Sequence, residues 1–249
     1  MKINRSLVSL IISFLLSSSL YADDSIRLVT LYAIDYRPYM IVRSDTEITG
    51  IDVDVTKAAF AAVNVDAVIK TAPWKRILKS LKHGRIAGTL SCSKRPGRDE
   101  FILFSEQLSS ATQVAVMAKQ TSSKALIRIS DMHQYSVTAV EGWGIQKQLE
   151  RLDIAHTQVP SIEAGINAVL HRDIDLFYNG ELTTRYIARQ NGQSLNLKYI
   201  HFSDQESTPF YLCLSKRFSG SDKLADLFNQ GLRKIKESGE FTEIYNRYL

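Results

Sequence analysis

Apolar residues along the chain follow two different spacings, and their alternation predicts strands separated by helices. Short runs rich in Val, Ile, Leu and aromatic residues predict strands at 27–34, 66–72, 86–93, 112–119, 136–140, 174–179 and 210–216. Helical spacing of apolar residues predicts helices at 52–63, 74–84, 142–152, 161–172 and 221–239. This order of elements is typical of an α/β fold.

Two of the predicted helices carry more specific signals. Ser161 is placed to cap the first turn of the helix at 161–172. The helix at 221–239 is amphipathic and places five apolar residues on one face: Leu224, Leu227, Phe228, Leu232 and Ile235.

The N-terminal segment is typical of a secretory signal peptide, which we expect to span residues 1–22. Lys2 and Arg5 precede an apolar run from Leu7 to Leu16, and Ala22 is a small residue at a suitable cleavage point. A membrane anchor is the alternative, but a spanning helix needs about 20 apolar residues. Neither cysteine lies near the cleavage point. We therefore expect an exported periplasmic protein without a lipid anchor.

Charge argues against nucleic acid as a partner. Removal of residues 1–22 takes away Lys2 and Arg5 and lowers the formal net charge from +5 to +3. Acidic and basic residues are interspersed along the chain, whereas a nucleic-acid-binding protein usually carries a basic face and a larger surplus.

Signals for metal or cofactor binding are weak, so we expect neither. The five histidines show no metal-binding spacing, and the chain has no phosphate-binding loop or nucleophile elbow. Gly142, Trp143 and Gly144 follow a strand and open a helix, where free backbone N–H groups suit a small polar or anionic group. Cys92 and Cys213 are compatible with a disulfide in an oxidising compartment and equally with buried free thiols.

Seven stretches carry a resemblance in their order along the chain: DYRPYM (35–40), GIDVDVTKAAF (50–60), PWKRILKSLKHGRIAG (73–88), SCSKRPGRDEFILFS (91–105), AVEGWG (139–144), DIDLFYNGE (173–181) and GEFTEIYNRYL (239–249). Together they resemble the type II periplasmic solute-binding proteins of the polar amino-acid class, bacterial extracellular solute-binding protein family 3. The resemblance implies two α/β lobes, 23–109 with 210–249 and 110–209. Crossover strands near 108–111 and 208–211 would join them around a ligand-binding cleft. Cys92 and Cys213 would then both lie in the first lobe, which leaves a disulfide open.

The same resemblance implies a set of ligand-binding residues. In this family a serine-rich strand end and an arginine hold the ligand carboxylate, and the matching positions are Ser91, Ser93 and Arg98. A guanidinium can form two parallel charge-assisted hydrogen bonds with a carboxylate, which supports the assignment. Lys94 and Arg95 are assigned to the solvated residues of the turn. Aromatic walls of the cleft are expected from Tyr36, Tyr39, Trp74 and Trp143, with core packing as the alternative for each.

Departures from the family pattern leave the ligand open. The position where many amino-acid binders place an Asp for the ligand ammonium is occupied by glycine in the stretch Asn179, Gly180 and Glu181. Gly144 replaces a hydroxyl residue at its helix start, and Ala87 replaces an Asp. We expect a small carboxylate-bearing ligand, with an amino acid or a derivative as the leading candidate.

Three classes of function follow from this resemblance. The first is a monomeric binding protein that presents its ligand to a membrane permease of the ABC type. The second is an enzyme similar to the exported cyclohexadienyl dehydratases, in which Glu181 or Glu141 would act as acid and base. The third is a ligand-sensing partner of a membrane receptor.

Overall fold

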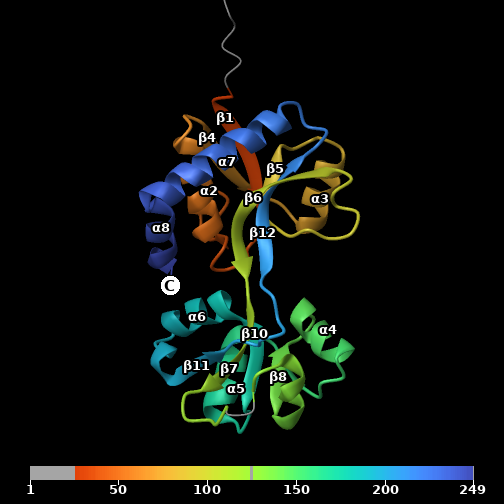
Figure 1. Ribbon diagram of the computed structural model, residues 1–249, viewed down its shortest axis with the longest axis vertical. Coiled ribbons are helices and arrows are strands. Elements are labelled where there is room, and N and C mark those ends of the chain that lie inside the picture. Colours follow the sequence, from red (N-terminus) through yellow and green to blue (C-terminus); the bar gives the residue numbers. More distant parts are fainter. Residues whose placement is uncertain (1–25, 124–125, 249) are drawn as a thin grey trace, which may run out of the picture.

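The computed structural model describes residues 26–123 and 126–248, which form two lobes, each built on a five-stranded sheet (Figure 1). The first sheet has the order β4 (Asp66–Thr71), β1 (Leu28–Ala33), β5 (Gly88–Cys92), β12 (Thr208–Ser215) and β6 (Ile102–Ala111). The second has the order β11 (Leu197–Ile200), β7 (Gln113–Ala118), β10 (Leu176–Gly180), β8 (Val137–Val140) and β9 (Thr157–Val159). The predicted two-lobed α/β fold is confirmed.

The expected signal peptide at 1–22 lies outside the described residues. Among the helices of residues 26–123 and 126–248, none is long and apolar enough to cross a membrane.

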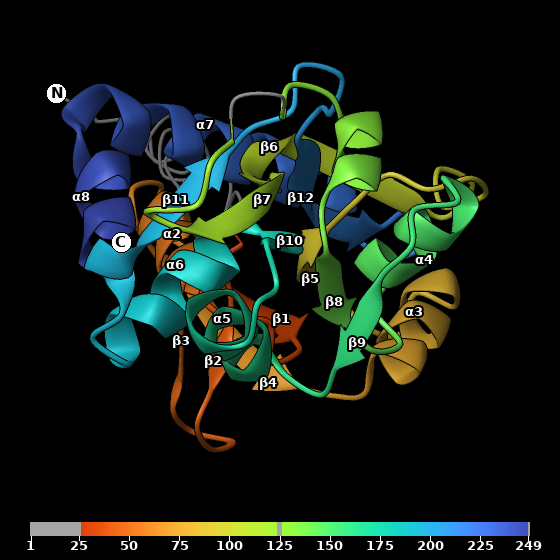
Figure 2. The same ribbon diagram turned by 90° about the horizontal axis from the view of Figure 1, so that it is seen from below.

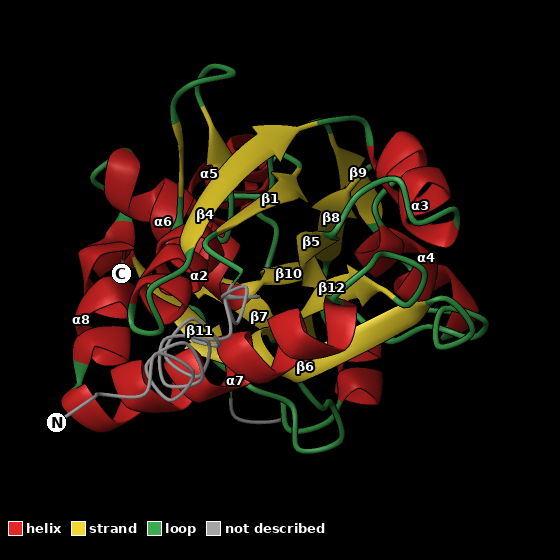
Figure 3. Ribbon diagram, turned by 90° about the horizontal axis from the view of Figure 1, so that it is seen from above, coloured by secondary structure: helices red, strands yellow, loops and turns green. Residues whose placement is uncertain are grey.

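Helices cover both faces of the first sheet. On one face lie α2 (Ile51–Ala61), α7 (Ser221–Ser238) and α8 (Glu240–Tyr248), and on the other lies α3 (Trp74–Lys82), as Figure 3 shows from above. The hairpin of β2 (Ile41–Val42) and β3 (Ile48–Thr49) leads into α2. Helices α2 and α7 touch at Gly231, where an added Cβ atom would lie 1.8 Å from the carbonyl oxygen of Ala59. Only glycine fits there without moving one helix.

The second sheet is also covered on both faces. Val114 and Val116 of β7 pack with α5 (Ile162–His171) and α6 (Glu181–Gln190). The alternate residues, Ala115 and Met117, pack with α4 (Gly144–Arg151) and the 3-10 helix η1 (Ile129–Gln134). Figure 2 shows α4 and α5 on opposite sides of β8 and β10, while the short η2 (Ser194–Asn196) precedes β11. Because β7 is buried on both faces, its apolar residues run without interruption.

Two chain segments connect the lobes side by side. One runs from β6 through Thr112 into β7, and the other runs from β11 through residues 201–207 into β12. β6 and β12 form an antiparallel pair in which Thr208 lies opposite Ala111. At the passage between the lobes, the hydroxyl oxygens of Thr112 and Ser207 lie 2.6 Å apart. The crossovers expected near 108–111 and 208–211 thus fall within paired strands.

Most predicted elements appear within a few residues of their expected bounds. The cap at Ser161 is confirmed, because its Oγ accepts a hydrogen bond from the backbone N–H of Ala164 at 3.2 Å. The full length of β6 was not predicted, and neither were β2, β3, β9, β11, α6 and α8. Helix α6 begins directly after β10 and contains three β-branched residues, Thr183, Thr184 and Ile187. Because such residues have a lower helix propensity, the sequence did not indicate a helix here.

Candidate functional site

A cavity of about 570 Å³ lies between the two lobes. Tyr36, Arg95 and Phe210 line it from the first lobe, while Trp143, Gly144, Lys147 and Arg151 line it from the second. A groove of about 730 Å³ exists on the first lobe, but its lining residues, such as Asp35 and Arg76, come from that lobe alone. We take the interlobe cavity as the candidate site because a cleft between lobes encloses a ligand when the lobes close.

Three of the predicted site residues line this cavity: Tyr36, Trp143 and Gly144. The ring of Tyr36 stacks on that of Tyr39, with centroids 5.2 Å apart, and meets Phe210 edge-on at 6.0 Å. Tyr39 itself is buried, and its hydroxyl donates to the carbonyl oxygen of Ser110 at 2.7 Å. Tyr39 therefore supports the aromatic wall from behind.

Arg98 does not line the cavity, although Arg95 of the same loop does, and it already has protein partners. Its Nη1 donates to the carbonyl oxygen of Ser93 at 2.8 Å, and its guanidinium lies 5.2 Å from the centroid of the half-buried Trp74 ring. Burial lowers the pKa of Arg98, and repulsion by Arg95 lowers it further. Since a guanidinium has five N–H donors, the remaining donors can still bind an acid.

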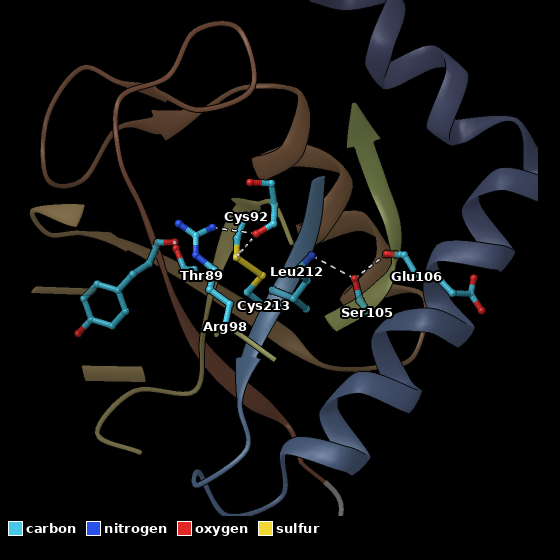
Figure 4. The surroundings of a disulfide bond; sticks show 9 residues. Thr89, Cys92, Arg98, Ser105, Glu106, Leu212 and Cys213 are labelled. Atoms are coloured by element: carbon cyan, nitrogen blue, oxygen red, sulfur yellow. Dashed lines mark hydrogen bonds between the residues drawn. A yellow bond between two sulfur atoms is a disulfide. The ribbon is translucent and has the colours of Figure 1, made fainter. Parts of the chain in front are cut away.

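The loop that carries Arg98 is anchored by a disulfide. Cys92 on β5 is bonded to Cys213 on β12, as Figure 4 shows with Arg98 beside the bond. This bond resolves the choice between a disulfide and two free thiols. On the neighbouring strand pair, β6 and β12, the hydroxyl of Ser105 accepts a hydrogen bond from the backbone N–H of Leu212 at 3.0 Å (Figure 4). Strands β5, β6 and β12 are therefore fixed directly beneath the loop.

A buried carboxyl group holds the base of the site together. Asp52, in the first turn of α2, is 0% exposed, and its Oδ2 accepts hydrogen bonds from Ser91 at 2.5 Å and from Ser109 at 2.8 Å. Its Oδ1 has no hydrogen-bond partner among the described residues. Burial raises the pKa of Asp52 to about 7, against the opposing effect of the two serine donors. The Ser91 hydroxyl proton is thus engaged with Asp52 in this structure.

The other predicted residues of the second lobe, Gly142, Asn179 and Glu181, do not line the cavity. The Gly142 N–H donates to Oε1 of Gln146 at 2.6 Å, within the same helix start. Asn179 is buried, and its amide donates to Thr184 at 2.9 Å. Glu181 forms an ion pair with Arg185 at 2.8 Å, and its other carboxylate oxygen lies 3.3 Å from Nε2 of His201. The Asn179 amide and the Glu181 carboxylate, which were expected to contact the ligand, therefore contact other residues of the second lobe instead.

Several residues that line the cavity were not predicted to do so from the sequence. Arg95, assigned to the solvated turn, is exposed and lines the cavity. Lys147, Gln148 and Arg151 were not singled out, although they share one face of α4 opposite the buried Leu149. Spacing of three and four residues from Gly144 would have identified this face. Asp52 belongs to the stretch at 50–60 that carries part of the family resemblance, but nothing in the sequence indicated that its carboxyl group is buried.

Metal binding has no structural candidate in the described part of the chain. Within residues 26–123 and 126–248, no group of three or more His, Cys, Asp or Glu side chains is placed to hold a metal ion.

Two named proteins match most of this chain in sequence. A membrane-bound lytic murein transglycosylase F from Desulfosudis oleivorans is 27% identical over 80% of this chain and 44% of its own length. An arginine-binding periplasmic protein from Mannheimia haemolytica is 23% identical over 86% of this chain and 87% of its own. The chain thus spans less than half of the transglycosylase but most of the binding protein.

Solved structures show the same architecture. A substrate-binding protein of a polar amino acid ABC uptake transporter from Streptococcus thermophilus has a TM-score of 0.74 at 18% identity, covering 90% of this chain and 86% of that one. At this identity the likeness establishes the fold alone. The family described as bacterial extracellular solute-binding proteins, family 3, matches residues 28–249. The chain therefore belongs to this family of solute-binding proteins.

Proposed function

We propose that this protein captures a small carboxylate-bearing ligand between its lobes and delivers it to an ABC-type membrane transporter. The observation that carries the proposal is the interlobe cavity, which aromatic and cationic residues of both lobes line. Residues from both sides meet one ligand only when the lobes approach each other, so ligand contacts favour the closed state.

In this proposal the Arg98 loop holds the ligand carboxylate from the first lobe. The disulfide and the Asp52 hydrogen bonds keep this half in place before binding. Trp143 and the start of α4 approach from the second lobe on closure. The protein acts as a monomer in the periplasm, where the disulfide is compatible with the oxidising environment.

An enzymatic activity has less support. Among the described residues that line the cavity there is no Asp or Glu to act as acid and base. Glu181 is engaged with Arg185 and His201, and Glu141 is exposed outside the cavity lining. We therefore propose no reaction for this cleft.

A ligand screen followed by solution scattering tests the proposal. A true ligand raises the melting temperature, because it binds the folded state selectively. At saturation it also reduces the radius of gyration, because the cleft closes. A panel of amino acids, carboxylates and amines that changes neither quantity would contradict the binding function. Capture of the liganded protein by solubilised membranes, followed by identification of the retained partner, separates a transporter from a receptor.

A further inference from the structure

The interlobe cavity has a one-sided charge distribution. Its described lining includes three cationic residues, Arg95, Lys147 and Arg151, and no acidic residue. Within residues 26–123 and 126–248, none of the three forms an ion pair with a carboxylate. These cations are therefore available to a ligand, and the potential inside the cavity is positive.

Two acidic residues that stand next to lining residues in the sequence are engaged elsewhere. Glu150 lies between Lys147 and Arg151 on α4, but it accepts a hydrogen bond from Gln146 at 2.8 Å and does not line the cavity. Asp204, beside Gln205 of the cavity wall, accepts the backbone N–H of Ile129 at 3.0 Å. The described lining of the cavity thus offers no carboxylate to hold a ligand ammonium.

Both lobes contribute a cationic and an aromatic part to the cavity lining. Lys147 and Arg151 are one turn apart on α4 and belong to the second lobe, whereas Arg95 belongs to the loop of the first. The aromatic residues Tyr36 and Phe210 line the cavity from the first lobe, and Trp143 lines it from the second. This arrangement matches a ligand with an acidic group at each end and an apolar or flat spacer.

We propose that the cleft selects a small dicarboxylate, whose second acid group binds Lys147 and Arg151 when the lobes close. The inference rests on the proposed function and adds the class of ligand. A cationic ligand such as arginine would bring a positive charge toward three unpaired cations, so the same cleft rejects it. The relative from Mannheimia haemolytica carries the name of an arginine-binding protein, and our proposal separates the present chain from it in specificity.

Titration calorimetry with a matched set of probes tests the proposal. Glutarate and phthalate carry two carboxylates, their monomethyl esters carry one, and arginine and histidine represent the basic amino acids. We expect the two dicarboxylates to bind more tightly than their monoesters, with an affinity that falls as salt is added. We expect no heat of binding from arginine.

Variants assign the second acid group to α4. Lys147→Gln and Arg151→Gln should each weaken dicarboxylate binding by about fivefold or more and leave monoester binding nearly unchanged. Lys119→Gln is the matched control, because Lys119 follows the far end of β7, about 20 Å along the strand from Gln113 of the cavity. Equal effects of all three substitutions would overturn the assignment to α4.

The outcomes also separate this inference from the proposed function. Binding and closure with arginine or histidine, without binding of either dicarboxylate, would refute the dicarboxylate inference and leave the binding function intact. Failure of every compound in the wider screen to raise the melting temperature would contradict both.

Discussion

The buried carboxyl group of Asp52 predicts an unusual dependence of stability on pH. Its pKa is about 7 in the folded protein, against an ordinary value of 3.8. The folded state therefore holds the proton more tightly than the unfolded chain. Unfolding releases that proton wherever the pH lies between the two values, so this group's contribution to stability falls as the pH rises.

The size of the effect follows from these two values. Below about pH 4 the carboxyl is neutral in both states, and its contribution is fully present. From there to about pH 7 the free energy of unfolding falls by about 1.4 kcal/mol per pH unit, or about 4 kcal/mol in total. Above pH 7 the carboxyl is charged in both states, and its contribution no longer changes.

Asp52→Asn isolates this contribution. The amide has the shape of the protonated acid, and its oxygen can accept the hydrogen bonds of Ser91 and Ser109, so we expect the variant to fold. Urea unfolding of both proteins at several pH values gives the difference in free energy, in which the other carboxyl groups cancel. The variant should gain stability relative to the wild type by up to about 4 kcal/mol between pH 4 and pH 7.

The control is Asp226→Asn, which removes an exposed carboxylate from α7 in the same lobe. A difference between Asp52→Asn and the wild type that stays constant across this pH range would refute the reasoning. It would mean that Asp52 ionises alike in the folded and unfolded chain despite its burial.

Three further changes test the framework of the site. Replacing Cys92 and Cys213 together by serine should lower the free energy of unfolding by about 2–5 kcal/mol, because the disulfide closes a long loop of the unfolded chain, and denaturant titration measures it. Gly231→Ala should destabilise the protein by about 3 kcal/mol or more, because the added methyl group forces α7 away from α2. Gly144→Ala should not destabilise it, because an added Cβ atom at Gly144 meets open space, and thermal unfolding compares the two variants. Arg98→Ala should weaken carboxylate binding by about 2–5 kcal/mol and Arg98→Lys should restore little of it, as measured by calorimetry. Wild-type affinity in both Arg98 variants would place the carboxylate clamp elsewhere.

The fold was predictable because its signals are local and repeated. The spacing of Leu224, Phe228 and Leu232 on α7 is visible without knowledge of any other segment, and so is the serine cap of α5. The lobe boundaries came only from the family resemblance. The alternation of strands and helices does not determine which strands share a sheet.

The site was less predictable because its geometry depends on distant segments. Ser91 and Asp52 are 39 residues apart in the chain, and only the folded sheet brings the serine onto the buried carboxyl. Glu181 looked available in the sequence, but Arg185 one turn later and His201 from the chain after β11 both engage it. A motif can therefore identify a residue without stating which partners it already has.

The first-lobe half of the cleft is built on strands that a disulfide and several side-chain hydrogen bonds join. In the first lobe, the disulfide joins β5 to β12, Asp52 joins β5 to β6, and the Tyr39 hydroxyl bonds to β6. Helix α4 belongs to the other lobe, which is connected through Thr112 and residues 201–207. In the proposed closure, each lobe would move nearly as a rigid body about these two connections. Substitutions in the first half should therefore change stability together with affinity, whereas substitutions on the exposed face of α4 should change ligand selectivity at nearly constant stability.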